Sequence, residues 1–282
     1  SRRSSPVTSP RSRPALAGSR STAPTALDPG RLATCETTAA PMGAGPRGGG
    51  GAPTGGAFQL AADAGTIDLG IGADLSADGR TGGAAVSGAN NPTGIGGAIL
   101  IRVEADALDS SRIDAGELFA TADGQAQAEI ELPPGVEAPV GNSQGGTMSV
   151  IVAGGTLTGN TLDLSANGGT GDGSTGNGTG GTATFTQTGG TVSVSDISIA
   201  ADGFGGTAQG VSGTGIGGIA AIDLSGGAIT AADITASANG EGGIGFTGDD
   251  SDPLNIVASG DGGIGRGGTA TISISAAAIV GA

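Results

Sequence analysis

The chain has 282 residues, a formal net charge of −15, 61 glycines and one cysteine, and it contains no histidine, lysine, tryptophan or tyrosine. This composition excludes a disulfide framework and a zinc site built from the usual Cys and His ligands. So acidic a surface repels phosphate backbones and anionic lipids, so we expect no nucleic-acid partner. No segment approaches the roughly 18 apolar residues of a membrane-spanning helix, so the chain is expected not to span a membrane.

Residues 1–56 form a segment rich in Pro, Ser, Gly and Arg, in which seven Arg oppose only Asp28 and Glu36. It has no periodic pattern and is predicted to be disordered. A wrongly assigned start, a stretch read in another frame, or a basic arm that docks on the acidic remainder are the alternatives. Residue 1 is Ser and no secretion signal is recognisable, so we expect an internal piece of a longer protein.

Residues 57–282 carry four Arg against 24 carboxylates and consist of a repeated unit. A shift of about 37 residues places Phe185 on Ile222, and a shift of about 35 in the other direction places it on Val150. Such self-similarity is the signature of a repeat architecture. The units start near residues 56, 97, 146, 181, 218 and 268, and the last is partial.

Each complete unit follows the same order, which the stretch GGTATFTQTGGTVSVSDISIAADG at 180–203 illustrates. A Gly-Gly pair opens the unit, an alternating strand follows, a second glycine marks a turn, and one or two more strands lead to Ala-Asp-Gly or Ala-Asn-Gly. We predict that this last glycine adopts a positive φ in a tight turn. Alternation predicts that Thr184, Thr186, Ser193 and Ser198 point outward, and that Phe185, Val192, Val194, Ile197 and Ile199 point inward.

One unit alone has too few aliphatic side chains to offset the entropy of ordering its backbone, whereas stacked units share ladder hydrogen bonds and a continuous core. We therefore predict an all-β fold, a parallel β-helix solenoid of about five coils plus a partial one, with each unit forming a three-sided turn. An antiparallel β-sandwich of short hairpins is the alternative, because it also has short strands at regular spacing.

Between units lie connections of variable length, expected along one corner of the stack. We predict that binding comes from these loops, chiefly 125–144 and 241–266, and from avidity across repeats. Within the first, Ala128–Leu132 could add a short strand before Pro133 and Pro134 end it. The connections span residues 80–95, 125–144, 169–179, 204–216 and 241–266.

The GGT-x-x-Φ…GG-x-Φ…ADG pattern (Φ, aliphatic or Phe) of residues 56–282 resembles the β-strand repeats of large Gram-negative surface proteins, namely filamentous-haemagglutinin-like proteins and autotransporter passengers. The resemblance implies a right-handed parallel β-helix that is secreted to the cell surface. It also implies adhesion to a host surface, glycan or matrix, or lateral self-association. The N-terminal secretion domain and C-terminal outer-membrane barrel of such proteins are not found in this sequence.

A polysaccharide-cleaving β-helix enzyme is the alternative function, since such enzymes use paired carboxylates. The sequence GDDSD clusters Asp249, Asp250 and Asp252, but no His or Lys is present to assist them and no Trp or Tyr to stack on sugars. A nucleophilic serine would lack a histidine base. We therefore assign no catalytic residue.

A calcium-dependent β-roll is a further alternative, with the consensus G-G-x-G-x-D-x-U-x. The stretch GGTGDGST places Asp172 one residue early, and the stretch from Ser259 lacks the Asp. Thr-x-Thr pairs such as Thr182 and Thr184 suggest an ice-binding face, but other units break the rank. The closing positions of the units form a column of Asp and Asn residues, which is either a metal ladder or a turn ladder. Its members are Asp78, Asp123, Asn167, Asp202 and Asn239. No metal or cofactor is assigned.

Overall fold

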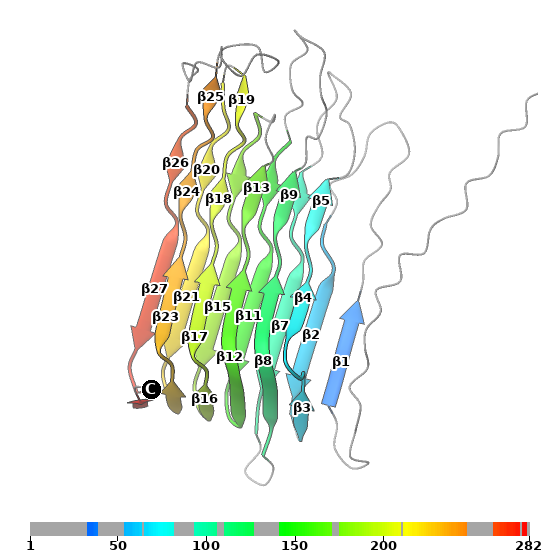
Figure 1. Cartoon of the computed structure of the whole chain (residues 1–282), viewed down its shortest axis with the longest axis vertical. Helices are drawn as coiled ribbons and strands as arrows, with labels where there is room; N and C mark the ends of the chain where they lie inside the picture. The colour runs from blue at the N-terminus through cyan, green and yellow to red at the C-terminus, as the bar shows by residue number, and fades with distance from the viewer. Residues whose placement is uncertain are drawn as a thin grey trace, which may run out of the picture.

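The computed structural model describes residues 33–38, 54–63, 65–81, 93–105, 110–126, 141–170, 175–209, 211–246, 262–276 and 278–280. These residues form β-strands and connecting turns without any helix, so none of them lies in a helix that could cross a membrane. Each strand of one unit pairs in parallel with the equivalent strand of the next, which produces a stack of units (Figure 1). The all-β class and the parallel stacking agree with the sequence, and the arrangement is β-helix-like.

A unit passes through four sheets in turn, here called B, A, C and D. Sheet A is the first long one, and its strands pair in register, so that Ala57, Ala98, Thr147, Thr182 and Ile219 lie in one row. Its parallel strands are β2 (Ala57–Ala62), β7 (Ala98–Val103), β11 (Thr147–Val152), β15 (Thr182–Gln187), β21 (Ile219–Leu224) and β27 (Thr269–Ile274).

Sheet C is the second long sheet, and it faces sheet A across the core. In two units a single long strand crosses it, whereas two short strands lie end to end in other units and pair with the long one. Its strands are β3 (Thr66–Asp68), β4 (Ala73–Ser76), β8 (Arg112–Thr121), β12 (Thr156–Ser165), β16 (Thr191–Ser193), β17 (Asp196–Ala200), β22 (Ala228–Thr230), β23 (Asp233–Ser237) and β28 (Ala278–Val280).

Sheets B and D are short, and they continue sheets A and C along the upper edge of the stack in Figure 1. Sheet B contains β6 (Gly94–Ile95), β10 (Ser143–Gln144), β14 (Gly178–Thr179), β20 (Gly215–Ile216) and β26 (Gly265–Arg266). Sheet D contains β5 (Gly79–Thr81), β9 (Gly124–Ala126), β13 (Gly168–Thr170), β18 (Gly203–Phe204) and β24 (Gly240–Glu241), and a further parallel pair joins β19 (Ala208–Gln209) to β25 (Gly245–Phe246).

This layout differs from the three-sided turn that the sequence suggested. A unit passes through four sheets, and the two short strands after the second glycine, β16 and β17, both lie in sheet C. The alternative fold, an antiparallel sandwich, does not fit the described strands, because every pairing among them is parallel except that of β1 (Ala33–Thr38) with β2.

Strand β1 lies inside residues 1–56, the segment predicted to be disordered. Its six residues pair antiparallel with β2 and place Cys35 opposite Leu60. This pairing gives the first strand of sheet A a hydrogen-bonded neighbour on its outer side, as edge strands require. These six residues form a strand, and the rest of residues 1–53 lies outside the described part of the chain.

The core between sheets A and C consists of the alternate residues that the sequence pattern selected. Of the five residues predicted to point inward, Phe185 and Val192 are fully buried, and Ile197 and Ile199 are 1% exposed. Val194 is 6% exposed. The Thr and Ser residues between them are half-buried or exposed. The inward and outward assignment is therefore confirmed.

Glycine explains why sheets B and D can approach so closely. A methyl group on Gly168 would lie 2.0 Å from the Thr179 carbonyl oxygen, and one on Gly203 would lie 2.0 Å from that of Ile216. The glycine after each Asp or Asn is thus required because two backbones touch, and the prediction that it needs a positive φ is wrong. Positive φ occurs instead at the turn from sheet A to sheet C, where Gly190 has a φ of 74°.

Candidate functional site

The Asp/Asn column at the ends of the units forms a hydrogen-bonded ladder. The Asp78 carboxylate accepts the backbone N–H of Asp123 at 2.9 Å, and Asp123 accepts that of Asn167 at 2.7 Å. The Asn167 side-chain oxygen accepts the N–H of Asp202 at 2.6 Å, and Asp202 accepts that of Asn239 at 2.5 Å. Each side chain therefore binds the same backbone position one unit further along.

Serine hydroxyls complete the ladder at two rungs. Ser165 donates to the Asp123 carboxylate at 2.6 Å and accepts a bond from the Asn167 amide at 2.8 Å. Ser237 stands in the same relation to Asp202 and Asn239, at 2.6 and 2.9 Å. At each of these two rungs the hydroxyl and the backbone N–H therefore bind the same carboxylate oxygen, Oδ1. Among the described residues no group of three or more His, Cys, Asp or Glu side chains could hold a metal ion.

Burial raises the pKa of Asp123 above its ordinary value, although the bonds from Ser165 and Asn167 act in the opposite direction. The neighbouring Asp78 raises this pKa further, and Arg80, which lies 3.9 Å from Asp78, lowers it. The column is therefore a hydrogen-bonded ladder between successive units.

The sequence did not reveal a second ladder, which lies at the entry to sheet B. The side-chain oxygen of Asn142 accepts the backbone N–H of Asn177 at 2.9 Å, and that of Asn177 accepts the N–H of Thr214 at 2.8 Å. The signal that could have found it is an Asn directly before β10 and another directly before β14, 35 positions apart.

The remaining candidate residues of the sequence lie outside the described residues. These are Asp249, Asp250 and Asp252 of the GDDSD stretch, Asp172 and Ser259 of the two calcium-like stretches, and Ala128–Leu132 with Pro133 and Pro134. Nothing described brings any of them together into a site.

The outer sides of the two long sheets differ in charge. The outer side of sheet C is acidic, and its one cation, Arg112, pairs with Asp114 at 2.5 Å. Burial raises the pKa of Asp163, opposed by a hydrogen bond with Ser198. The carboxylates on the strands of this sheet are Asp68, Asp74, Asp114, Glu117, Asp163, Asp196 and Asp233.

The outer side of sheet A is nearly uncharged. On its six parallel strands the only charged residues are Arg102 and Asp223, in β7 and β21. Arg102 forms an ion pair with Glu104, just beyond the end of its strand. The Thr-x-Thr pairs lie on this side, and in register with them lie Ile219, Ala221 and Leu100, so the threonine rank is interrupted as the sequence indicated.

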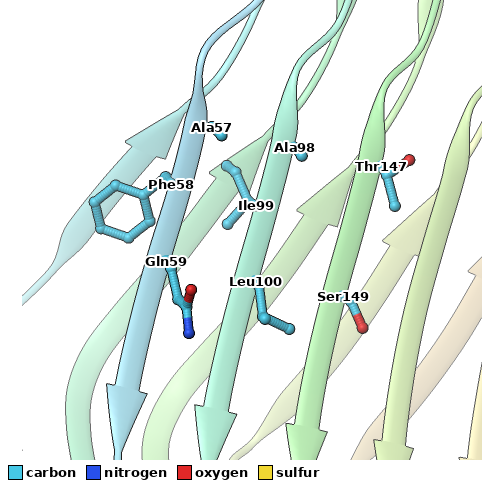
Figure 2. Close-up of a pocket in the computed structure, with 8 residues that line it drawn as sticks. All are labelled: Ala57, Phe58, Gln59, Ala98, Ile99, Leu100, Thr147 and Ser149. Carbon is cyan, nitrogen blue, oxygen red and sulfur yellow. The ribbon is translucent and has the colours of Figure 1, made fainter. Parts of the chain in front are cut away.

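A shallow hollow of about 360 Å³ opens on the same side, over β2, β7 and β11 (Figure 2). Ala57, Gln59, Ala98, Leu100 and Thr147 contribute to its lining. It exists because small side chains occupy neighbouring outward positions. A second hollow, of about 540 Å³, follows the Gly-Gly pairs between sheets B and A, and none of its lining residues is charged. Neither hollow holds an acid–base pair.

Comparison of the chain with protein-family models, with curated proteins and with solved structures gave no match.

Proposed function

We propose that this chain is a non-catalytic structural module that acts in attachment or matrix formation at the cell surface or outside the cell. Its units wind as a right-handed parallel β-helix, the hand that crossover connections between parallel strands almost always take. The resemblance to haemagglutinin-like repeats supports the location, and the acidic, nearly cysteine-free composition is compatible with it.

The observation that carries the proposal is the position of the variable connections. Each runs from a strand of sheet D to the next strand of sheet B, so all of them begin and end along one edge of the stack, the upper edge in Figure 1. They span residues 82–93, 127–142, 171–177, 205–214 and 242–264. The turns from sheet A to sheet C lie along the opposite edge of the stack. In four of the units they span only residues 63–65, 153–155, 188–190 and 225–227.

Binding surfaces are commonly built from loops of different length on a rigid scaffold. Apart from the connection 104–111, the connections vary in length only along the edge formed by sheets B and D. A stack of this kind fits the arrangement, and repeated weak contacts along it add avidity. The partners are then glycans, host surfaces or matrix components, and the acidic residues described above serve the scaffold.

The test is an adhesion assay with beads coated in the full chain, applied to epithelial cells, bacterial cells and a glycan array. In two variants a short Gly-Ser linker replaces residues 127–140 or residues 247–261. The matched control replaces residues 106–109 with the same linker. These residues belong to the connection between β7 and β8, which joins sheet A to sheet C along the opposite edge of the stack. We expect adhesion to be lost in at least one loop variant and kept in the control. Equal adhesion in all variants, or none for the unmodified chain, would contradict the proposal.

A further inference from the structure

The outer side of sheet A is self-complementary. On β7, β11, β15 and β21 its outward residues form three rows of four, set by the parallel register. The first row is Ala98, Thr147, Thr182 and Ile219; the second is Leu100, Ser149, Thr184 and Ala221; the third is Arg102, Ile151, Thr186 and Asp223. All twelve side chains are exposed or half-buried.

We propose that this face, here called the row face, joins two copies of the chain through a two-fold axis that lies between the copies and runs parallel to the strands, between β11 and β15. Such an axis keeps each row in place and reverses its order, so β7 of one copy lies over β21 of the other. The proposal goes beyond the attachment function and does not depend on what the loops bind.

The charges support this axis. Arg102 and Asp223 are the only charged residues in the three rows, and they occupy the two ends of the same row. Reversal places Arg102 opposite Asp223 of the second copy, and symmetry forms the pair twice. Arg102 keeps its bond to Glu104, since a guanidinium has five N–H donors. Asp63 follows β2 in the first unit, where reversal brings it toward Ser275, the residue after β27 of the second copy.

Side-chain size gives a second, independent match. In the first row the exposed Ile219, with 48% of its surface accessible, lies opposite Ala98, which lines the hollow of Figure 2. In the second row Leu100 lies opposite Ala221. In the third row Ile151 lies opposite Thr186. Each large aliphatic side chain therefore meets a small one, as interdigitating sheets require.

The other two-fold axis in the plane of the face is unfavourable. An axis perpendicular to the strands would place Arg102 against Ala98 and Asp223 against Ile219, and each charge would lose water without gaining a partner. Copies related by the first axis avoid that penalty.

The area is sufficient for association. Six strands about 4.8 Å apart and six residues long give a face of roughly 29 by 20 Å, so two copies bury on the order of 1,100 Å². Stable specific interfaces begin at about 1,000–1,200 Å². The acidic sheet C disfavours any face-to-face contact made on that side, because two copies of it would repel each other.

The first experiment measures the dimer dissociation constant of the full chain by sedimentation over a concentration series. We expect a reversible dimer, which Arg102→Asp weakens at least about tenfold because two carboxylates then face each other on both sides of the axis. Asp223→Arg in the same chain should restore it. Arg112→Asp, the same charge change on sheet C, is the control and should leave the constant unchanged.

The second experiment tests the axis by mixing two single-cysteine proteins in a Cys35→Ser background, one with Leu100→Cys and one with Ala221→Cys. Within one chain these positions lie three strands, roughly 14 Å, apart, too far for a disulfide. Oxidation should link the mixed copies and neither variant with itself. A monomer at all concentrations, failure of the charge exchange to restore the dimer, or self-linking of Leu100→Cys would each overturn the proposal.

Discussion

At the scale of single residues, the Asp and Asn side chains at the unit ends act as backbone acceptors. Each one binds an N–H of the next unit, so the column adds side-chain bonds to the parallel ladder on either side of it. Both Asp and Asn supply the required oxygen, which explains why either residue type occurs there. The carboxylates bring a charge that this role does not need.

Replacing Asp123 by Asn should therefore stabilise the protein at pH 7. The pKa of Asp123 is raised in the folded state, so the folded protein binds its proton more tightly than the unfolded chain does. Its charge then lowers the free energy of unfolding at neutral pH, and this penalty disappears as the pH falls through the folded pKa toward the ordinary value of about 3.9. An Asn can keep the bond to Asn167 without the charge.

Thermal melts between pH 3 and pH 8 would check this prediction. The stabilisation of Asp123→Asn should be largest at neutral pH and shrink in acid, while Asp196→Asn, a change at an exposed carboxylate, serves as the control. A loss of stability at pH 7 would mean that the carboxylate makes a contribution that an amide cannot replace.

Two adjacent glycines of β13 make it possible to distinguish the effect of close backbone packing from the general effect of replacing a glycine. A methyl group on Gly168 would lie 2.0 Å from a carbonyl oxygen, whereas one on Gly169 would meet nothing within 4 Å. Gly168→Ala should cost about 3 kcal/mol or more, because a backbone must move. Gly169→Ala should lie within about 0.5 kcal/mol of the unmodified protein or above it. Urea denaturation measures both, and equal effects would contradict the close approach of sheets B and D.

At the scale of strands, the sequence was sufficient to find the repeat, the register and the buried positions. Strict alternation within a strand selects one face, and the constant spacing between units fixes the partner, so Phe185 pairs with Val150 and Ile222 as the shifts indicated. Alternation within a strand does not indicate which strands belong to the same sheet. The assignment of β16 and β17 to a single sheet follows from long-range pairing with β12, which no local pattern encodes.

The role of the glycines was also beyond local reasoning. An Asp-Gly or Asn-Gly pair has the same local preference whether it makes a turn or meets a second backbone. Only the opposing strand of sheet B or D distinguishes the two cases. The face of sheet A was equally hidden, because its complementarity joins residues from four units.

Burial along the stack predicts a graded response to a buried charge. Ile197 lies in an internal unit and is 1% exposed, whereas Ile234 in the next unit is only partly buried. Ile197→Asp should cost more than about 4 kcal/mol or prevent folding, and Ile234→Asp should cost less. Ser193→Asp, on the exposed side of β16, should be close to neutral. Circular dichroism melts would show the order, and a neutral Ile197→Asp would invert the assigned faces.

At the scale of the whole molecule, one stack combines three kinds of surface. Sheet C is acidic and sheet A is nearly neutral. The connections of variable length leave from the edge of the stack that sheets B and D form. Self-association through the neutral side would leave those connections free on both copies, and two sets of weak contacts would then bind together.

Calcium should leave the stability of the stack unchanged. One oxygen of each ladder carboxylate already accepts a backbone N–H, and no group of three or more described carboxylates could hold a metal ion. Melts of the chain in millimolar calcium and in EDTA should therefore coincide. A large rise with calcium would show that metal binding is coupled to folding.

The most direct test of the fold is a set of electron paramagnetic resonance distances across sheet C. Asp74, Phe119, Asp163, Ser198 and Thr235 lie in one outward row of five adjacent strands. In a Cys35→Ser background, diluted with unlabelled protein, spin labels at Asp74 and Thr235 should be about 19 Å apart, and labels at Asp74 and Ser198 about 14 Å apart. Distances that grow by one strand spacing per unit are the result that the parallel stack predicts. Distances that do not increase in the order of the units would contradict it.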